Sequence, residues 1–243
     1  MIYGNRSIYD RGLRTHQEHA RRFGYPVSVL RKPIMSGTYS KCAILLSEML
    51  RELEKPPGER LEWLFWFDSD SVLMNANMPL EVFLPPPRLS EVHLLLTKDW
   101  NGLNNGVYFI RVNEWSVRLI SATISYHVLN PDVPLAWQDQ SALKMLVDEH
   151  EYFSKHVVYC PLRWFNAYMR SPDALQPNPD SPDHLQVHPG DLLVHFPGTP
   201  SEHLDQTLSP YLEIAENHVS EWEPPLEQTG YTEITKDFWD QIN

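Results

Sequence analysis

The segment Asp68-Ser69-Asp70 is the first place where residue types and spacing suggest chemistry. It follows the nearly continuous apolar run Leu61–Phe67, which is typical of a strand buried on both faces. Loops at the carboxyl ends of strands in open α/β sheets often bind ligands. Two carboxylates there can share one Mg²⁺ or Mn²⁺ ion, which could hold the diphosphate of a nucleotide-sugar. The alternative is a solvated acidic turn, because Asp-x-Asp also occurs by chance.

A second candidate is His195 in the segment Val194-His-Phe-Pro-Gly198, where a short predicted strand meets a tight turn. A neutral imidazole at this point could serve as a third metal ligand. The chain has 11 histidines, and a single one more often makes an ordinary structural hydrogen bond. Both interpretations stay open on the residues alone.

Two further segments carry residue types suited to binding a sugar. Trp100-Asn-Gly-Leu-Asn-Asn-Gly106 combines an indole face for stacking with amides that can bond hydroxyl groups. Asn and Gly also build tight turns, so a plain hairpin turn is the alternative. Trp137-Gln-Asp-Gln-Ser141 places Asp139 at a predicted helix start. Its carboxylate is by default a helix cap, or it projects with the Gln140 amide into a cleft.

The composition limits the classes of partner. The 243 residues include 20 Lys and Arg against 32 Asp and Glu, a net charge of −12. Such a chain is a poor binder of nucleic acid and of anionic lipid, because phosphate contacts need clustered cations. A phosphate-bearing ligand would need a bound divalent metal. Cys42 and Cys160 are too few for a disulfide scaffold or a zinc site, so buried free thiols are predicted and a single bridge stays open.

These candidate residues must be positioned by alternating helices and strands, which predict a mixed, largely parallel α/β sheet. The first helix is expected to be capped by Ser7 and ended by Gly24. Predicted helices are Ser7–Phe23, Ser40–Glu54, Asn113–Leu129 (capped by Asn113), Asp139–His150 and Ser201–Val219 (kinked at Pro210), with a short one over Pro79–Leu84. Predicted strands are Pro26–Leu30, Leu61–Phe67, Val92–Thr97, Val107–Val112, Val157–Tyr159 and Asp191–His195; Lys98–Gly106 and 171–190 are predicted as loops. No apolar run is long enough to span a membrane, and the N-terminus has no signal-peptide pattern.

Five stretches, in order along the chain, resemble glycosyltransferase family 34. That family groups fungal galactosyl- and mannosyltransferases with plant xyloglucan xylosyltransferases, and the resemblance is closest to the fungal branch. Each stretch is weak alone, whereas the ordered set is specific. The stretches are Leu13-Arg-Thr-His-Gln-Glu-His-Ala-Arg-Arg-Phe-Gly-Tyr25, Trp66-Phe-Asp-Ser-Asp70 with Asn75, Lys98-Asp-Trp-Asn-Gly-Leu-Asn-Asn-Gly106, Gln138-Asp-Gln-Ser141 and His195-Phe-Pro-Gly198.

The resemblance implies a GT-A fold, a Rossmann-like α/β sandwich, over residues 1–220, with 221–243 as a C-terminal tail or helix. It implies a retaining hexosyltransferase of the Golgi lumen that moves galactose or mannose to a glycan acceptor, expected to be a mannoside. The donor would be UDP-galactose or GDP-mannose. The cofactor would be Mn²⁺, with Mg²⁺ as the second choice, held by the DxD motif Asp68 and Asp70 and by His195.

The resemblance also assigns Asp139 and Gln140 to the reacting centre. The Asp139 carboxylate could stabilise charge at the anomeric carbon, orient an acceptor hydroxyl, or attack as a nucleophile. A front-face mechanism, in which the leaving phosphate takes the acceptor proton, needs no protein nucleophile. The substrate-binding residues expected are Lys41, Trp100, Asn101, Gly102, Asn104, Asn105, Gly106 and Gly198.

Three departures from the family pattern stand out. Only Met1 and Ile2 precede the segment resembling the family at Tyr3-Gly4-Asn5, so most of the first strand is expected to be missing. Thr199-Pro-Ser201 stands where some members carry a lysine facing the diphosphate. The metal would then neutralise more of the charge, unless Lys41 or Arg163 assists. Members of the family are typically anchored in the Golgi by an N-terminal transmembrane helix, and none is predicted in this sequence.

Two alternatives come from other classes of protein. A catalytically impaired sugar-binding pseudoenzyme would keep the amide-rich cleft without transferring a sugar. A haloacid-dehalogenase-like phosphatase would use Asp68-Ser-Asp-Ser-Val72 with Asp68 as nucleophile and Asp70 as acid and base. That class also needs a later acidic pair, and the position four residues after Asp191 is His195.

Overall fold

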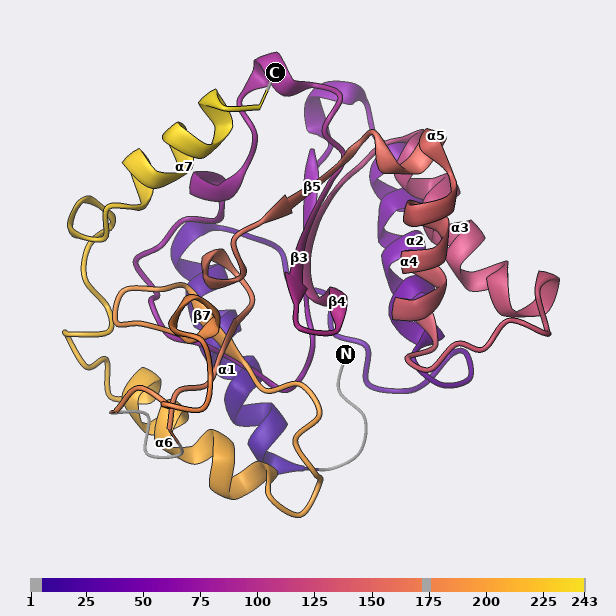
Figure 1. Ribbon diagram of the computed structural model, residues 1–243. Helices are drawn as coiled ribbons and strands as arrows, with labels where there is room; N and C mark the ends of the chain where they lie inside the picture. The colour runs from indigo at the N-terminus through magenta and orange to yellow at the C-terminus, as the bar shows by residue number, and fades with distance from the viewer. Residues whose placement is uncertain (1–5, 172–175, 243) are drawn as a thin grey trace. The chain divides into compact units, whose positions relative to one another are not determined.

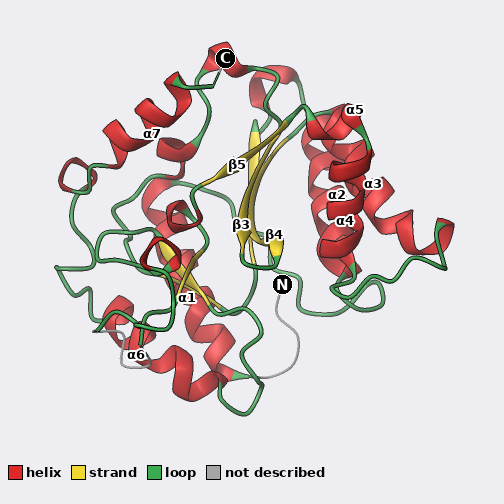
Figure 2. Ribbon diagram, viewed as in Figure 1, coloured by secondary structure: helices red, strands yellow, loops and turns green. Residues whose placement is uncertain are grey.

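A computed structural model describes residues 6–171 and 176–242, which form two compact units. The first unit comprises Leu30–Trp66 and Glu91–Cys160. The second comprises the residues up to Val29, Phe67–Ser90 and the residues from Pro161 onward. Helices and strands are mixed throughout the described residues, so the predicted α/β class is confirmed (Figure 2).

The first unit is built on a four-stranded sheet with the order β1-β4-β3-β5. β3 and β4 form an antiparallel hairpin, and β3 pairs with β5 in parallel. The strands are β1 (Trp63–Phe67), β3 (Leu94–Asp99), β4 (Gly102–Arg111) and β5 (Val157–Cys160). The helices are α2 (Tyr39–Glu54), α3 (Glu114–Leu129), α4 (Asp139–Glu149) and α5 (Glu151–Ser154).

The core of the first unit lies between this sheet and its helices. Figure 1 shows α2, α3 and α4 side by side along the sheet. Leu94 and Ile110 from the strands cluster with Met49 of α2, Leu119 of α3 and Leu143 of α4. Each fully buried side chain of this size stabilises the fold by about 1.5–3 kcal/mol. The helices therefore owe their position to apolar packing on the sheet.

The second unit has a smaller sheet with the order β2-β7-β6. β7 pairs with β2 in antiparallel and with β6 in parallel orientation. Helices α1 and α6 pack on β2 around Val72, Val194, Phe196 and Tyr211. The elements are α1 (Ser7–Phe23), β2 (Ser71–Leu73), β6 (Ala167–Tyr168), β7 (Leu193–His195), α6 (Leu204–Glu216) and α7 (Tyr231–Asp240).

Short 3-10 helices connect the longer elements in both units. The predicted helix over Pro79–Leu84 is one of them, because its turn is only four residues long. They are η1 (Pro57–Glu59), η2 (Leu80–Phe83), η3 (Pro87–Leu89), η4 (Leu162–Trp164), η5 (Asp183–Leu185) and η6 (Leu226–Gln228). The predicted boundary between 1–220 and 221–243 stays a prediction.

The long helices agree with their predicted ranges, whereas their caps agree only in part. Gly24 ends α1 in the left-handed conformation, with φ 76°, as expected. Arg6, not Ser7, is the N-cap of α1, and it makes no side-chain capping bond. Asn113 caps α3 as predicted, because its Oδ1 accepts the Ser116 N–H at 2.9 Å.

Three predictions that concern strands were wrong, wholly or in part. Pro26–Leu30 is not a strand, and Pro26, Val27 and Ser28 are exposed. β1 is only half-buried because it is the edge strand of its sheet. Lys98–Gly106 is not a loop: β3 runs to Asp99 and β4 starts at Gly102.

The sheets are mixed rather than largely parallel, since the β3–β4 hairpin and the pairing of β2 with the distant β7 are both antiparallel. Cys42 and Cys160 are buried free thiols, as predicted. Across the described ranges, no helix combines the length and apolar character that crossing a membrane requires. The expected loss of a strand before Tyr3–Asn5 lies outside the described residues.

We expect Asn113→Ala to lower the free energy of unfolding by about 1 kcal/mol, because the Ser116 N–H loses its acceptor. Urea denaturation measures this change. Asn113→Asp keeps the acceptor and should behave like the unaltered chain. Equal loss in both variants would contradict the capping role.

Candidate functional site

Asp68, Asp70 and His195 come together in the second unit. Each offers one ligand atom, and these atoms all lie within 4.8 Å of one another. The β2–β7 pairing is the cause, because it sets Ser71 opposite His195. The N–H of Phe196 extends this pairing by donating to the Asp70 carbonyl at 2.9 Å. The sheet therefore brings the predicted metal ligands to one place.

The hydrogen bond to Asn166 decides which nitrogen of His195 can bind a cation. His195 Nδ1 lies 2.8 Å from Asn166 Oδ1, and a carbonyl oxygen can only accept. Nδ1 therefore carries the proton and Nε2 keeps its lone pair, an arrangement common among metal-binding histidines. Nε2 is 3.6 Å from Asp70 Oδ1. Two atoms that each bind one ion at about 2.1 Å lie about 3.0–4.2 Å apart, so the distance between His195 Nε2 and Asp70 Oδ1 fits a shared divalent cation.

A second group of possible ligands, Glu91, His93 and His156, lies in the first unit. Its geometry suits a cation less well. The two imidazoles stack with their centroids 4.5 Å apart and an interplanar angle of 16°. Ring nitrogens bind metals along lone pairs in the ring plane, and the lone pairs of stacked rings do not converge on one ion. The fit to a cation therefore favours the group around His195.

The hairpin between β3 and β4 carries most of the predicted sugar-binding residues. Trp100 is 64% exposed at the turn, and the neighbouring Asn101 N–H donates to Asp99 Oδ1 at 2.6 Å. Gly102, with φ 102°, has a backbone conformation that favours glycine. Asn104 Nδ2 donates to Asp99 Oδ2 at 3.1 Å, while its Oδ1 accepts the Gly106 N–H at 2.9 Å. These amides hold the turn that presents Trp100.

A buried polar cluster in the first unit joins three elements. Asn105 of β4 donates from Nδ2 to Asp139 Oδ2 at 2.8 Å, and its backbone N–H donates to Gln140 Oε1 at 3.1 Å. Lys41 of α2 donates from Nζ to the Asn105 carbonyl at 2.8 Å and lies 3.8 Å from Asp139 Oδ2. Lys41 and Asp139 are 4% and 2% exposed. The structure thus brings Lys41, Asn105, Asp139 and Gln140 together as predicted.

The residue before Asp139 has an unusual backbone. Gln138 has φ 46° and ψ −112°, which is rare for a residue with a side chain. Its Oε1 accepts the Thr38 N–H at 2.8 Å, and a Cβ on Gly37 would lie 1.9 Å from the same atom. Such strain costs about 1–3 kcal/mol and often occurs at functional sites. Gln138 therefore holds the start of α4 in a fixed position.

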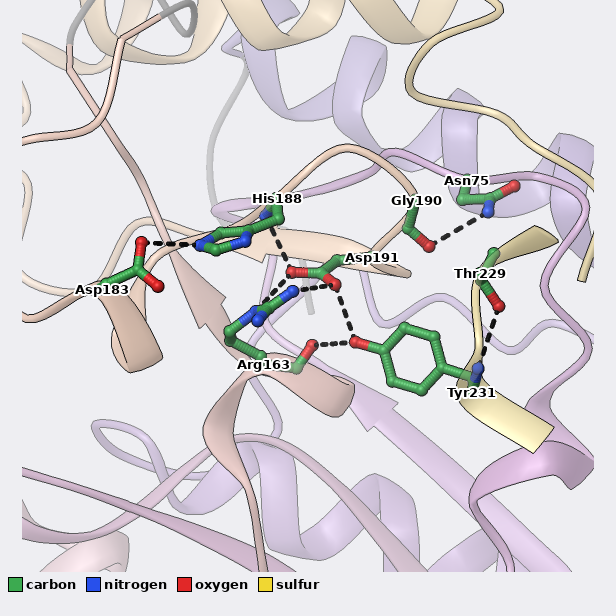
Figure 3. A network of polar contacts seen from close by, with 8 residues as sticks. All are labelled: Asn75, Arg163, Asp183, His188, Gly190, Asp191, Thr229 and Tyr231. Carbon is green, nitrogen blue, oxygen red and sulfur yellow. Dashed lines mark hydrogen bonds and ion pairs between the residues drawn. The ribbon is translucent and has the colours of Figure 1, made fainter. Parts of the chain in front are cut away.

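Arg163 is committed to a different network, shown in Figure 3. Its guanidinium donates to both oxygens of the buried Asp191 carboxylate, at 3.0 and 2.9 Å, and the Tyr231 hydroxyl donates to Asp191 Oδ1 at 2.8 Å. Burial and the Asp191 charge raise the pKa of Tyr231. Asn75 has a similar structural role, since its Nδ2 donates to the carbonyls of Gly190 and Pro224, each at 3.1 Å. These contacts support α7 and its loop.

The predicted Gly198 lies in an exposed turn after β7 with φ 71°. The turn has no lysine, but Arg6 at the N-terminus of α1 donates from Nη1 to the Ser201 carbonyl. No motif in the sequence pointed to Asn166 or Arg6. Gln138 belongs to the motif Gln138-Asp-Gln-Ser141, but only its backbone angle φ of 46° shows that it is strained.

Comparison with solved structures identifies the fold. A crystal structure of a glycosyltransferase involved in the glycosylation of the major capsid of PBCV-1 matches with a TM-score of 0.57. The match covers 83% of this chain and 92% of that one at 18% identity, so it shows the fold alone. The predicted GT-A glycosyltransferase fold is confirmed.

The sequence comparisons show which family the chain resembles. Residues 87–205 match the profile of the galactosyl transferase GMA12/MNN10 family, which confirms the expected resemblance to glycosyltransferase family 34. An alpha-1,2-galactosyltransferase of Schizosaccharomyces pombe is 25% identical over 76% of this chain and 55% of its own length. A probable alpha-1,2-galactosyltransferase gmh1 of the same yeast is 24% identical over 62% and 51%. The probable alpha-1,6-mannosyltransferase MNN10 of Saccharomyces cerevisiae is 23% identical over 64% and 47%, so this chain spans about half the length of these relatives.

We expect Lys41→Met to lower the free energy of unfolding by about 3–5 kcal/mol, because the Asp139 carboxylate loses its buried counter-charge. The double variant Lys41→Met/Asp139→Asn should lose less than the sum of the two single changes. Lys144→Met removes an exposed lysine and should change stability by less than about 0.5 kcal/mol. Additive losses in urea denaturation would contradict the pairing.

Proposed function

We propose that the chain transfers a hexose, galactose or mannose, from a nucleotide-sugar to a glycan acceptor in a metal-dependent reaction that retains the anomeric configuration. The observation that carries the proposal is the group Asp68, Asp70 and His195, with the free lone pair of His195 set by Asn166. The relatives named galactosyltransferase and mannosyltransferase support both sugars, and hence UDP-galactose or GDP-mannose as donor. A mannoside acceptor and a Golgi location are part of the same proposal.

Asp68, Asp70 and His195 would hold Mn²⁺, or Mg²⁺ as the second choice. The bound ion supplies positive charge that stabilises a departing diphosphate. The protein itself supplies little, since its net charge is −12 and both Lys41 and Arg163 are paired with internal carboxylates. Arg6, exposed next to the turn at Ser201, is the chain's own candidate for a phosphate contact.

The contacts of Asp139 favour a positioning and electrostatic role over nucleophilic attack. Its carboxylate is almost fully buried, and Oδ2 accepts the Asn105 amide. A nucleophile must approach the anomeric carbon to about 3–3.5 Å. We therefore favour the front-face mechanism, in which Asp139 holds Asn105 and its negative charge stabilises the cationic sugar.

Gln140 and the hairpin would bind sugar hydroxyl groups. Gln140 Oε1 is occupied by the Asn105 N–H, which leaves its amide hydrogens as donors. Trp100, exposed at the turn with Asn101 and Gly102, offers an apolar face on which a sugar ring can stack. Asn104, Gly106 and Gly198 would shape the binding surface through their turns.

The proposal predicts Mn²⁺-dependent release of UDP or GDP from its sugar nucleotide, stimulated by a mannoside. Asp68→Asn and Asp70→Asn should each lower the rate at least about 100-fold, because the diphosphate loses its bound cation. Asp180→Asn removes an exposed acid and should leave the rate unchanged. Full activity in the folded Asp68 and Asp70 variants would rule out the metal assignment.

The same assay separates the alternatives. Binding of a nucleotide-sugar without turnover would indicate the sugar-binding pseudoenzyme. Hydrolysis of p-nitrophenyl phosphate without nucleotide release would indicate the phosphatase, which the glycosyltransferase fold disfavours.

A further inference from the structure

Helix α1 has a buried polar face, which is unusual for a helix that packs on a core. Gly12, Thr15, His16 and His19 stand at the spacing i, i+3, i+4 and i+7, so they share one side of the helix. All four are buried. Polar groups are costly to bury unless each is hydrogen-bonded, so the partners of this face are informative.

The partners outside α1 all lie in the segment that carries the acidic loop and β2. Thr15 Oγ1 accepts the Leu73 N–H at 3.0 Å and donates to the Gly12 carbonyl at 2.7 Å. His19 Nε2 donates to the Met78 carbonyl at 2.7 Å. At Gly12 the helix approaches this segment so closely that a Cβ would lie 2.9 Å from the Ser71 carbonyl oxygen. Thr15 thus satisfies a backbone N–H of the three-residue strand β2, and His19 satisfies a backbone carbonyl in the segment that follows it.

His16 is the member of this face that reaches the acidic loop. Its Nε2 lies 3.0 Å from Ser71 Oγ, and Ser71 Oγ donates to the Asp68 carbonyl at 2.6 Å. Because the serine proton is used on Asp68, Ser71 Oγ accepts the His16 N–H. The imidazole also stacks on Phe67, with centroids 3.7 Å apart and an interplanar angle of 3°. Burial, followed by the charge of His19, lowers the pKa of His16 to about 3, so the ring stays a neutral, fixed donor.

We propose that His16 is a positioning residue that sets the metal-binding geometry of Asp68 through Ser71. The chain of contacts runs from the His16 N–H to Ser71 Oγ and on to the Asp68 carbonyl, and so closes the turn between Asp68 and Ser71. β7 holds the other side of the loop, through the Phe196 N–H on the Asp70 carbonyl. The inference rests on the proposed metal site and adds to it a residue that contacts no metal ligand side chain.

Removal of a buried hydrogen bond normally lowers the stability of the fold and can also lower the affinity for a metal. The proposal predicts that two variants of α1 separate these two effects. His16→Met and Thr15→Val each remove one hydrogen bond of the same helix face to the same segment. Only His16 is linked to Asp68. The two variants should therefore lose comparable stability, whereas only His16→Met should lose affinity for the metal.

The experiment is calorimetric titration of the full chain with Mn²⁺ alone, together with thermal unfolding. We expect His16→Met to weaken Mn²⁺ binding about tenfold, the usual effect of losing a group that orients a metal ligand. Ser71→Ala should weaken it similarly. His16→Gln, whose amide can still donate to Ser71, should recover most of the affinity, and Thr15→Val should bind Mn²⁺ as the unaltered chain does.

Unchanged affinity in both His16→Met and Ser71→Ala, or an equal loss in Thr15→Val, would overturn the proposal. If His16→Met does not fold, Ser71→Ala and His16→Gln decide the question. The Asp68→Asn variant distinguishes the two levels of inference. If Asp68→Asn binds Mn²⁺ normally, the metal site itself is wrong and the role of His16 fails with it; if Asp68→Asn loses binding while the His16 and Ser71 variants retain it, only the role of His16 is wrong.

Discussion

The antiparallel pairing of β2 with β7 is the constraint on which the proposed metal chemistry depends. Each strand has only three residues, yet their register sets Ser71 opposite His195 and so brings the acidic loop to the imidazole. A shift of one residue would turn His195 to the other face of the sheet. Two hydrogen bonds link α1 to the same segment from outside the sheet: His16 of α1 contacts Ser71 Oγ at the end of the loop, and Thr15 of α1 accepts the Leu73 N–H of β2. They add to the few hydrogen bonds that such short strands can form.

Each unit also has an ion pair on a buried carboxylate: Lys41 with Asp139 in the first, where both partners are buried, and the half-buried Arg163 with Asp191 in the second. A buried charge needs a partner, because loss of hydration costs several kcal/mol for each ion. Pairing therefore commits these two cations to internal carboxylates. In a chain with a net charge of −12, these two cations are thus engaged elsewhere and do not offset the charge of a phosphate, which increases the proposed dependence on a metal.

The helices were predictable because their signals are local. Apolar spacing, the Asn113 cap and the Gly24 stop all lie within a few residues of the ends they define. Strands were less predictable, since a strand needs a partner from elsewhere in the chain. Pro26–Leu30 has strand-like residues without a partner, whereas polar Asn104 and Asn105 lie buried inside β4 because Asp99 and Asp139 satisfy their amides.

The sequence by itself determined the α/β class, the resemblance to family 34 and the residue types of both candidate sites, because ordered motifs and local periodicity can be read along one chain. Only the tertiary structure decided which nitrogen of His195 is free, that Lys41 pairs with Asp139, and that His16 supports the acidic loop. Each of these facts joins residues from separate elements. The distances and hydrogen bonds between such residues are set by the packing of strands and helices, so they cannot be read from the order of residues along the chain.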